Sequence, residues 1–114
     1  MKVDFIRSCC GSFPHVTETV QWEDNLVFKV GGKMFALMPL EPAAAWLAFK
    51  CSPEDFAELT ERPGVIPAPY LARAHWVALE SEDAIPAAEL KRLLRAAYGW
   101  VYAKLPKKVR EGLG

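Results

Sequence analysis

The side chains best suited to chemistry in this 114-residue chain are its three cysteines and two histidines. Cys9, Cys10 and Cys51 could supply thiolates, and His15 and His75 could supply imidazoles, to a metal ion or to a nucleophilic mechanism. Their spacing argues against a metal centre, because the sequence has no Cys-x-x-Cys or His-x-x-x-His pair and adjacent cysteines rarely reach the same ion. We expect no metal and no cofactor, and we interpret Cys9 and Cys51 as small buried apolar side chains.

The usual catalytic motifs are also missing from the sequence. There is no Gly-x-Ser-x-Gly, and Gly31-Gly32 lacks the phosphate-loop pattern and leads into an expected strand rather than a helix. Cys51 and His75 fall on different expected elements, so a nucleophile–base pair between them remains an open alternative. We expect no catalytic residues and predict that the chain is not an enzyme.

The proline-bearing loop at residues 67–71, PAPYL, is the region that most resembles a site. With Arg73, His75 and Trp76 it combines aromatic rings, a cation and an imidazole on a constrained loop, and loops carry function more often than cores do. A plainer interpretation is that Tyr70 and Trp76 fill the edge of the core. We favour this interpretation for Trp76, and we leave open a ligand or enzymatic site around Tyr70, Arg73 and His75 as the least favoured hypothesis.

Basic side chains that could contact the phosphates of nucleic acid are spread along the chain. Such contacts give affinity without sequence specificity. The candidates are Lys29, Lys33, Lys50, Arg73, His75, Lys104, Lys107, Lys108 and Arg110. Because 14 basic and 14 acidic residues cancel, any attraction to DNA must come from a local patch. Cations near the C-terminus also have a plain explanation, since they suit the dipole of a solvated helix end.

Length and composition predict one domain over residues 1–114, with a core built from a sequence that is 52% hydrophobic. No apolar run approaches the roughly 20 residues that a membrane-spanning helix needs, and Asp4 and Arg7 interrupt any signal peptide. The odd number of cysteines without a secretory signal predicts reduced thiols and a cytoplasmic location. Thermal unfolding should therefore be the same with and without a reductant.

The elements that must position these residues are organised around a hairpin at residues 26–38. Two apolar runs flank Gly31-Gly32, a pair suited to the positive backbone angles of a two-residue turn. The expected register places five apolar side chains on one face, with Leu26 opposite Leu37, Phe28 opposite Phe35, and Val30 opposite Lys33.

The other elements predict an α+β fold. We expect a helix over residues 3–10, strands over 17–22, the later half of 43–50 and 74–79, a turn at 23–25, a helix after Ser52-Pro53, an irregular loop over 65–71, a long helix over 86–104 and a further helical turn in the basic tail. Short turns between strands make the sheet antiparallel. The predicted architecture is a β-meander plus a further strand, covered by N-terminal, middle and long C-terminal helices.

Six segments, in order, resemble the MmcQ/YjbR family of small bacterial proteins: PHVTE at 14–18, FKVGGKMFALM at 28–38, KCSPEDFAEL at 50–59, PGVIPAPYL at 63–71, HWVAL at 75–79 and YAKLPKK at 102–108. They span nearly the whole chain, and the combination of KVGGKMFAL with PAPYL is specific. The resemblance implies a YjbR-like α+β fold and a DNA-binding role through paired hairpins, a "double wing". His15 stands where the family more often has Gly, so we expect a differently shaped first turn.

Two hypotheses of function follow. The first is a non-enzymatic, DNA-binding protein that makes weak, largely non-specific contacts to the phosphate backbone. The alternative is a cytoplasmic protein-interaction module that uses the sheet face or a sheet edge and binds no nucleic acid. We expect no membrane partner, and a monomer rather than an oligomer.

Overall fold

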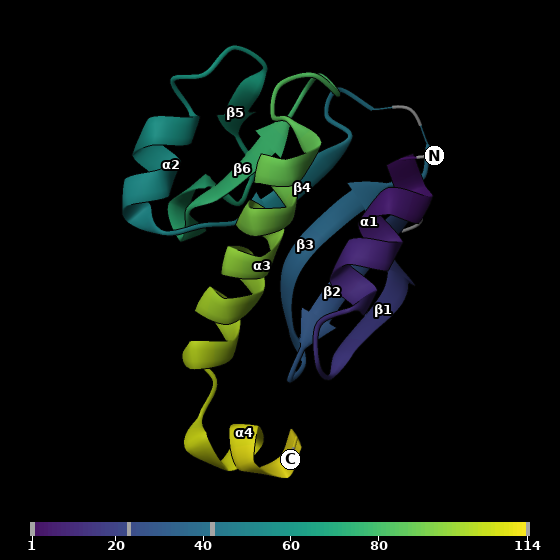
Figure 1. Cartoon of the computed structure of the whole chain (residues 1–114), viewed down its shortest axis with the longest axis vertical. Helices are drawn as coiled ribbons and strands as arrows, with labels where there is room; N and C mark the ends of the chain where they lie inside the picture. The colour runs from purple at the N-terminus through teal and green to yellow at the C-terminus, as the bar shows by residue number, and fades with distance from the viewer. Residues whose placement is uncertain (1, 23, 42, 114) are drawn as a thin grey trace.

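The structure, a computed structural model, describes residues 2–22, 24–41 and 43–113. In chain order the elements are α1 (Lys2–Gly11), β1 (Val16–Gln21), β2 (Asn25–Val30), β3 (Lys33–Pro39), β4 (Leu47–Lys50), α2 (Pro53–Leu59), β5 (Val65–Pro67), η1 (Ala72–Ala74, a short 3₁₀ helix), β6 (Trp76–Leu79), α3 (Ala87–Ala103) and α4 (Lys107–Leu113) (Figure 1). Among these residues, no helix has the length and apolar character that crossing a membrane requires.

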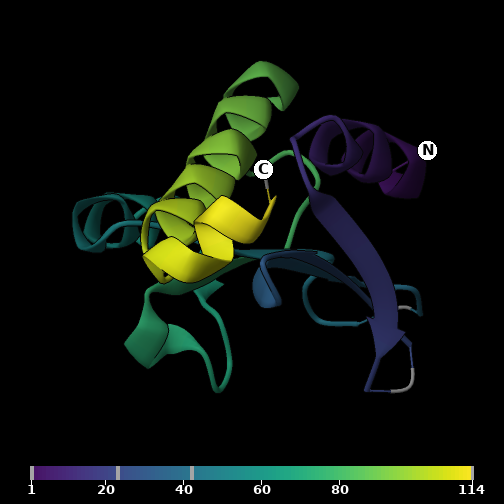
Figure 2. The ribbon, with the colours of Figure 1, turned by 90° about the horizontal axis from the view of Figure 1, so that it is seen from below.

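The strands form one six-stranded antiparallel sheet in the order β1-β2-β3-β4-β6-β5. The helices lie on one face of this sheet, and the connection from β5 to β6 extends beyond the opposite face, which we call the open face (Figure 2). The predicted α+β class is therefore confirmed. One element was predicted wrongly: residues 65–67 form the edge strand β5 rather than an irregular loop. Pro67 lacks a backbone N–H, but an edge strand tolerates this because one side of it is unpaired.

The central hairpin has the predicted turn but a different register beyond it. Gly31 and Gly32 have φ angles of 59° and 82°, and Val30 pairs with Lys33 as expected. A β-bulge then inserts Phe35 as an extra residue, so that Phe28 lies opposite Ala36. The predicted partners Phe28–Phe35 and Leu26–Leu37 are wrong.

The bulge decides which side chains reach the core. Phe35 and Ala36 both join the core under the helices, Met38 follows them, and Leu37 turns to the open face. Without the bulge, strict alternation would have buried Leu37 and exposed Met38. Strand β3 therefore has two consecutive core residues, Phe35 and Ala36, and Phe35 has no partner in the β2–β3 ladder.

The helix-side core holds an aromatic group that ties both ends of the chain together. The rings of Phe13, Phe35 and Tyr98 lie with centroids 5.1 to 6.2 Å apart, a spacing typical of favourable ring contacts. The hydroxyl of Tyr98 donates a 2.7 Å hydrogen bond to the carbonyl of Pro14. Leu90 and Leu94 continue the apolar side of α3 toward its start.

The predicted helix start at Ser52-Pro53 is confirmed. Ser52 Oγ accepts a hydrogen bond from the backbone N–H of Asp55 at 3.1 Å, as an N-cap does. A bidentate ion pair between Arg62 and Glu89, with a shortest N–O distance of 2.6 Å, joins the end of α2 to the start of α3. The hydrogen bond from Arg62 is the main reason why the pKa of the Glu89 carboxyl is lowered.

Several loop residues other than glycine adopt left-handed backbone angles. His15 has φ 64°, so it takes the conformation that favours glycine at the position where the resembled family more often has Gly. Trp22 (φ 47°) precedes the predicted turn at 23–25, in which Glu23 lies outside the described residues. The carbonyl of Trp22 accepts hydrogen bonds from Asp24 N and Asn25 Nδ2 at 3.0 and 3.1 Å.

The two turn glycines make a matched pair for testing the hairpin. A Cβ on Gly31 would lie 2.6 Å from Leu105 Cδ1, whereas a Cβ on Gly32 would meet nothing within 4 Å. We predict that Gly32→Ala destabilises the fold by about 1 kcal/mol through its positive φ alone. Gly31→Ala should cost at least about 1 kcal/mol more, because the buried Leu105 must also shift. Urea unfolding of both variants measures this difference, and equal destabilisation of the two would contradict the close approach of Leu105.

Candidate nucleic-acid interface

One end of the sheet gathers cations from distant parts of the chain. The start of β3, the end of β4, the start of β6 and the end of α3 meet there. Lys33, Lys50 and Lys104 line a pocket of about 240 Å³ together with Trp76 and Trp100. We call this region the lysine end.

Aromatic and backbone contacts hold two of these lysines. Lys104 Nζ lies 5.0 Å from the centroid of the Trp100 ring, a cation–π contact. Lys50 Nζ donates to the carbonyl of Ala74. The pKa of Lys50 is lowered, chiefly by desolvation, and the positive charge of Lys104 acts in the same direction while Cys51 opposes it. The two ammonium groups therefore repel each other across the pocket.

The segment η1 places two further sequence candidates beside Lys50. The backbone N–H of Cys51 donates to the carbonyl of His75 at 2.9 Å, which fixes this segment against the end of β4. Arg73 is exposed, whereas the His75 ring packs edge-on against Phe56 with centroids 5.5 Å apart. His75 thus has a packing role that Arg73 lacks.

Helix α4 carries the tail cations next to the hairpin turn. Leu105 and Val109 lie where a side chain on Gly31 would be. Lys107 and Lys108 are exposed, with Lys107 Nζ 3.9 Å from Glu111, and Arg110 is half-buried. Lys29 differs from the other candidates, since it is half-buried on β2 and pairs with Met34, which packs on the open face.

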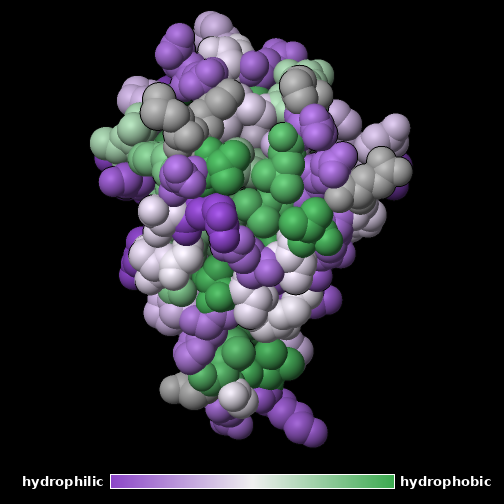
Figure 3. All heavy atoms as spheres, turned by 90° about the vertical axis from the view of Figure 1, so that its right-hand side faces the viewer, coloured by the Kyte–Doolittle hydropathy of each residue, from purple (hydrophilic) through white to green (hydrophobic). Residues whose placement is uncertain are grey.

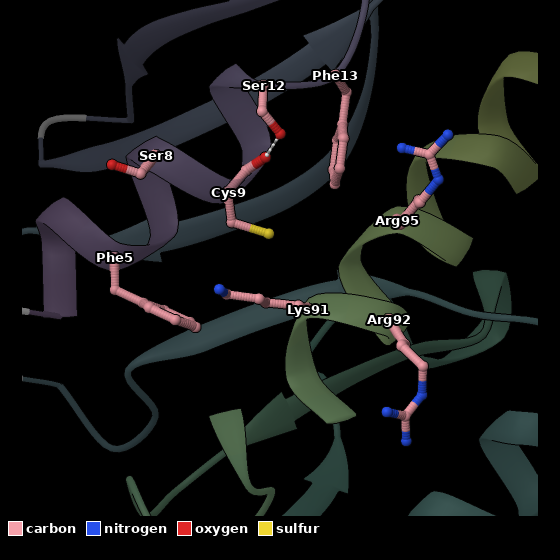
Figure 4. Close-up of a pocket in the computed structure, with 8 residues that line it drawn as sticks. All are labelled: Phe5, Ser8, Cys9, Ser12, Phe13, Lys91, Arg92 and Arg95. Atoms are coloured by element: carbon pink, nitrogen blue, oxygen red, sulfur yellow. Dashed lines mark hydrogen bonds between the residues drawn. The ribbon is translucent and has the colours of Figure 1, made fainter. Parts of the chain in front are cut away.

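The sequence prediction missed three cations in the middle of α3. Lys91, Arg92 and Arg95 line a second pocket, of about 400 Å³, between α1 and α3 (Figure 4). The sequence shows that Lys91 and Arg95 are four residues apart, a spacing that places them on the same side of a helix. The opposite wall comes from Phe5 and Phe13, near the other end of the chain.

The open face carries an apolar groove of about 520 Å³. Leu37, Ala48 and Ala78 form part of its lining, and Trp22 and Tyr70 border it. The interpretation of Trp76 as a core residue is confirmed, since it is 3% exposed, but the same interpretation is wrong for Tyr70, whose side chain is fully exposed. The left-handed φ of Tyr70 (65°) belongs to a turn that directs this ring outward.

Comparison with known proteins decides the family. The model of the YjbR family matches residues 11–99. The chain belongs to the YjbR family. Among curated proteins, none matches the chain.

Two solved structures resemble this YjbR chain. One is the crystal structure of a Deinococcus radiodurans protein described by the domain DUF419, with 35% sequence identity, a TM-score of 0.85, and coverage of 98% of this chain and 87% of that chain. The other is a Pseudomonas syringae protein with 20% identity and a TM-score of 0.65, covering 87% of this chain and 96% of that chain. The second likeness concerns the fold alone.

The thiols of this YjbR chain are free and shielded. Cys10 and Cys51 are buried and Cys9 is half-buried. The Cys51 Sγ donates to the backbone carbonyl of His75 at 3.3 Å rather than to its imidazole, so the open alternative of a Cys51–His75 nucleophile pair finds no support. Within the described ranges, no group of three His, Cys, Asp or Glu side chains could hold a metal ion.

Burial of the thiols predicts that the fold loses stability as the pH becomes alkaline. Desolvation is the largest cause that raises the pKa of Cys51, to about 11. The folded chain therefore keeps a proton that the unfolded chain releases at the ordinary thiol pKa of about 8.5. This contribution to stability is complete below that pH and declines as pH rises toward 11.

We predict that Cys51→Ala flattens the fall in unfolding free energy between about pH 8 and about pH 10, because it removes the thiol that titrates in the unfolded chain. Urea titrations at both pH values measure this, with the exposed Ser8→Ala as a control that should keep the wild-type slope. A parallel fall in wild type and Cys51→Ala would show that this thiol does not titrate as burial requires.

Proposed function

We propose that this chain binds duplex DNA weakly and with little sequence preference, through phosphate contacts at the lysine end, and that it does so without catalysis. The observation that carries the proposal is the convergence of Lys33, Lys50 and Lys104 on one pocket. A chain with zero net charge can attract a polyanion only through such a local patch. We further propose that it acts as a monomer in the cytoplasm.

The cations of the lysine end are not neutralised within the described residues. Among the described residues, ion pairs join Arg7 to Glu18, Arg62 to Glu89 and Lys107 to Glu111. None of these pairs uses Lys33, Lys50 or Lys104. Cations that already repel each other gain most from a phosphate, because it relieves repulsion and releases counterions.

The topology also supports an interface with two projections. The hairpin β2–β3 turns at the lysine end, and the connection from β5 to β6 returns to the same end beside β4. Lys33 directly follows the first turn at the start of β3, and the second connection carries Arg73. Two such projections beside a basic pocket suit contact with the backbone on either side of a groove.

A second candidate function rests on the open-face groove. Its lining residues are uncharged, and it is bordered by Trp22, which is 59% exposed, and Tyr70. Exposed aromatic residues around an apolar depression are typical of protein-binding surfaces. The alternative function is therefore capture of an apolar peptide segment on the open face, with no role for nucleic acid.

The DNA proposal predicts that the triple variant K33Q/K50Q/K104Q binds duplex DNA more weakly than wild type. The slope of log affinity against log salt should fall by roughly 0.9 for each phosphate that the variant no longer neutralises. Fluorescence anisotropy of a labelled short duplex at low salt measures both quantities. The variant K91Q/R92Q/R95Q is the matched control, since it removes the same charge from the middle of α3 and should bind as wild type does.

Two results would reject the lysine end as a DNA site. One is an equal decrease in affinity in both triple variants, which would mean that only net charge matters. The other is no binding by wild type at protein concentrations near ~100 μM in low salt, the weak limit of non-specific affinity. Circular dichroism melts establish that each variant is folded, which matters most for Lys50 because of its hydrogen bond to Ala74.

The peptide proposal predicts that Leu37→Lys weakens capture without changing DNA binding. A displayed peptide library selected on wild type should yield apolar sequences whose affinity falls at least ~10-fold on this variant, because the groove would then hold an unpaired charge. Lys33→Leu serves as a control for surface charge. If the selected peptides bind wild type and Leu37→Lys equally, the groove is not their site.

A further inference from the structure

The pocket between α1 and α3 combines cations with a carbon-rich wall. Helix α3 supplies Lys91 and Arg95, and α1 with its following turn supplies Phe5, Cys9 and Phe13. Figure 4 shows the Lys91 ammonium group directed toward the space between Phe5 and Cys9, and the Arg95 guanidinium group beside Phe13. Arg92 points away from α1 and contributes to the outer rim.

Lys91 and Arg95 form no ion pair among the described residues. Arg92 forms none among those residues either, although its charge helps to lower the pKa of Glu89. Glu89 binds Arg62 at 2.6 Å, and Glu18 binds Arg7 at 3.0 Å.

The aromatic rings hold the cations without neutralising them. Lys91 Nζ lies 5.6 Å from the centroid of Phe5, and Arg95 Cζ lies 5.7 Å from the centroid of Phe13. Cation–π contacts orient a charge and leave its hydrogen-bond donors free for another partner. The Cys9 thiol adds no negative charge at neutral pH, because desolvation raises its pKa despite the nearby Lys91.

The end of α1 accounts for only part of this charge. The end of α1 and the turn that follows it line the pocket opposite the α3 cations, so these cations also face the partly negative C-terminus of α1. That terminus is equivalent to about half an elementary charge. Lys91 and Arg95 together therefore keep more than one positive charge available to a ligand.

We infer that this pocket binds a small phosphate ester that carries an apolar or aromatic group. Lys91 and Arg95 hold the phosphate, which carries about −1.5 to −2 charges at neutral pH. The carbon part lies against Phe5, Phe13 and the Cys9 side chain. A volume of about 400 Å³ is in the range of small-molecule sites and exceeds what inorganic phosphate alone requires.

This site is separate from the lysine end. Lys91 and Lys104 are 13 residues apart on α3 and its cap, roughly 20 Å along the helix axis. The inference goes beyond the proposed DNA binding, and the variant K33Q/K50Q/K104Q should bind the ester as wild type does. Failure of either proposal thus leaves the other intact.

The probe is phenyl phosphate, titrated into ¹⁵N-labelled protein and followed by amide chemical shifts. We expect saturable shifts confined to residues near 5–13 and 91–95, with affinity at least ~10-fold higher than for inorganic phosphate or for phenol. K91Q/R95Q should lower the affinity at least ~10-fold, since it removes both charge-assisted contacts. K91R/R95K should retain most of it, which separates charge from a structural role.

The matched control is K107Q/K108Q, which removes two exposed cations from α4 and should leave the affinity unchanged. An equal decrease in K107Q/K108Q and K91Q/R95Q would overturn the proposal, because binding would then follow net charge. Shifts that do not saturate, or that centre on other residues, would overturn it as well. Equal affinity for phenyl phosphate and inorganic phosphate would reject the apolar part of the ligand.

Discussion

The close approach of Leu105 to the backbone of Gly31 sets the relation between the hairpin and the last helices. Leu105 is almost fully buried and occupies the space that any side chain on Gly31 would need. Because Lys104 precedes Leu105 and Lys33 follows the glycine turn, this single contact brings the two lysines together. The approach of Lys104 to Lys33 thus depends on one missing Cβ. The contact also places α4 against the hairpin turn. Helix α4 forms the lower end of the molecule in Figure 1 and in the space-filling view of Figure 3.

Features of the fold that depend on local chemistry could be predicted from the sequence, and those that depend on packing could not. Gly31-Gly32 and Ser52-Pro53 predict a turn and a helix start because their backbone preferences act within a few residues. The bulge at Phe35 is different, since FALM alternates acceptably in either register. The bulged register differs by placing Ala36 and Met38 in the helix-side core and Leu37 on the open face, a choice that depends on packing on both faces of the sheet. The short strand β5 was missed because a proline-bearing segment forms a strand only when a neighbour such as β6 is present.

The same distinction between local chemistry and packing applies to the candidate site. Residue types identified Lys33, Lys50 and Lys104, but their convergence depends on strand order, which brings the start of β3 beside the end of β4. The spacing of Lys91 and Arg95 was equally visible, yet its meaning depends on aromatic residues some eighty positions earlier. Tyr70 is a different case: its aromatic type left both a core and a site role open, and the turn that holds it decides its exposure.

The hydrogen bond from Tyr98 to Pro14, 84 positions apart, has a consequence for biosynthesis. Helix α3, which covers Phe28 and Phe35, comes after every strand of the sheet. A ribosome adds residues at about 5–20 per second, so the nascent sheet waits seconds for its cover while its apolar face is open to other chains. Folding must then finish only as α3 emerges. A product truncated before residue 87 would have only α1 and α2 to cover that face, and it should aggregate or be degraded.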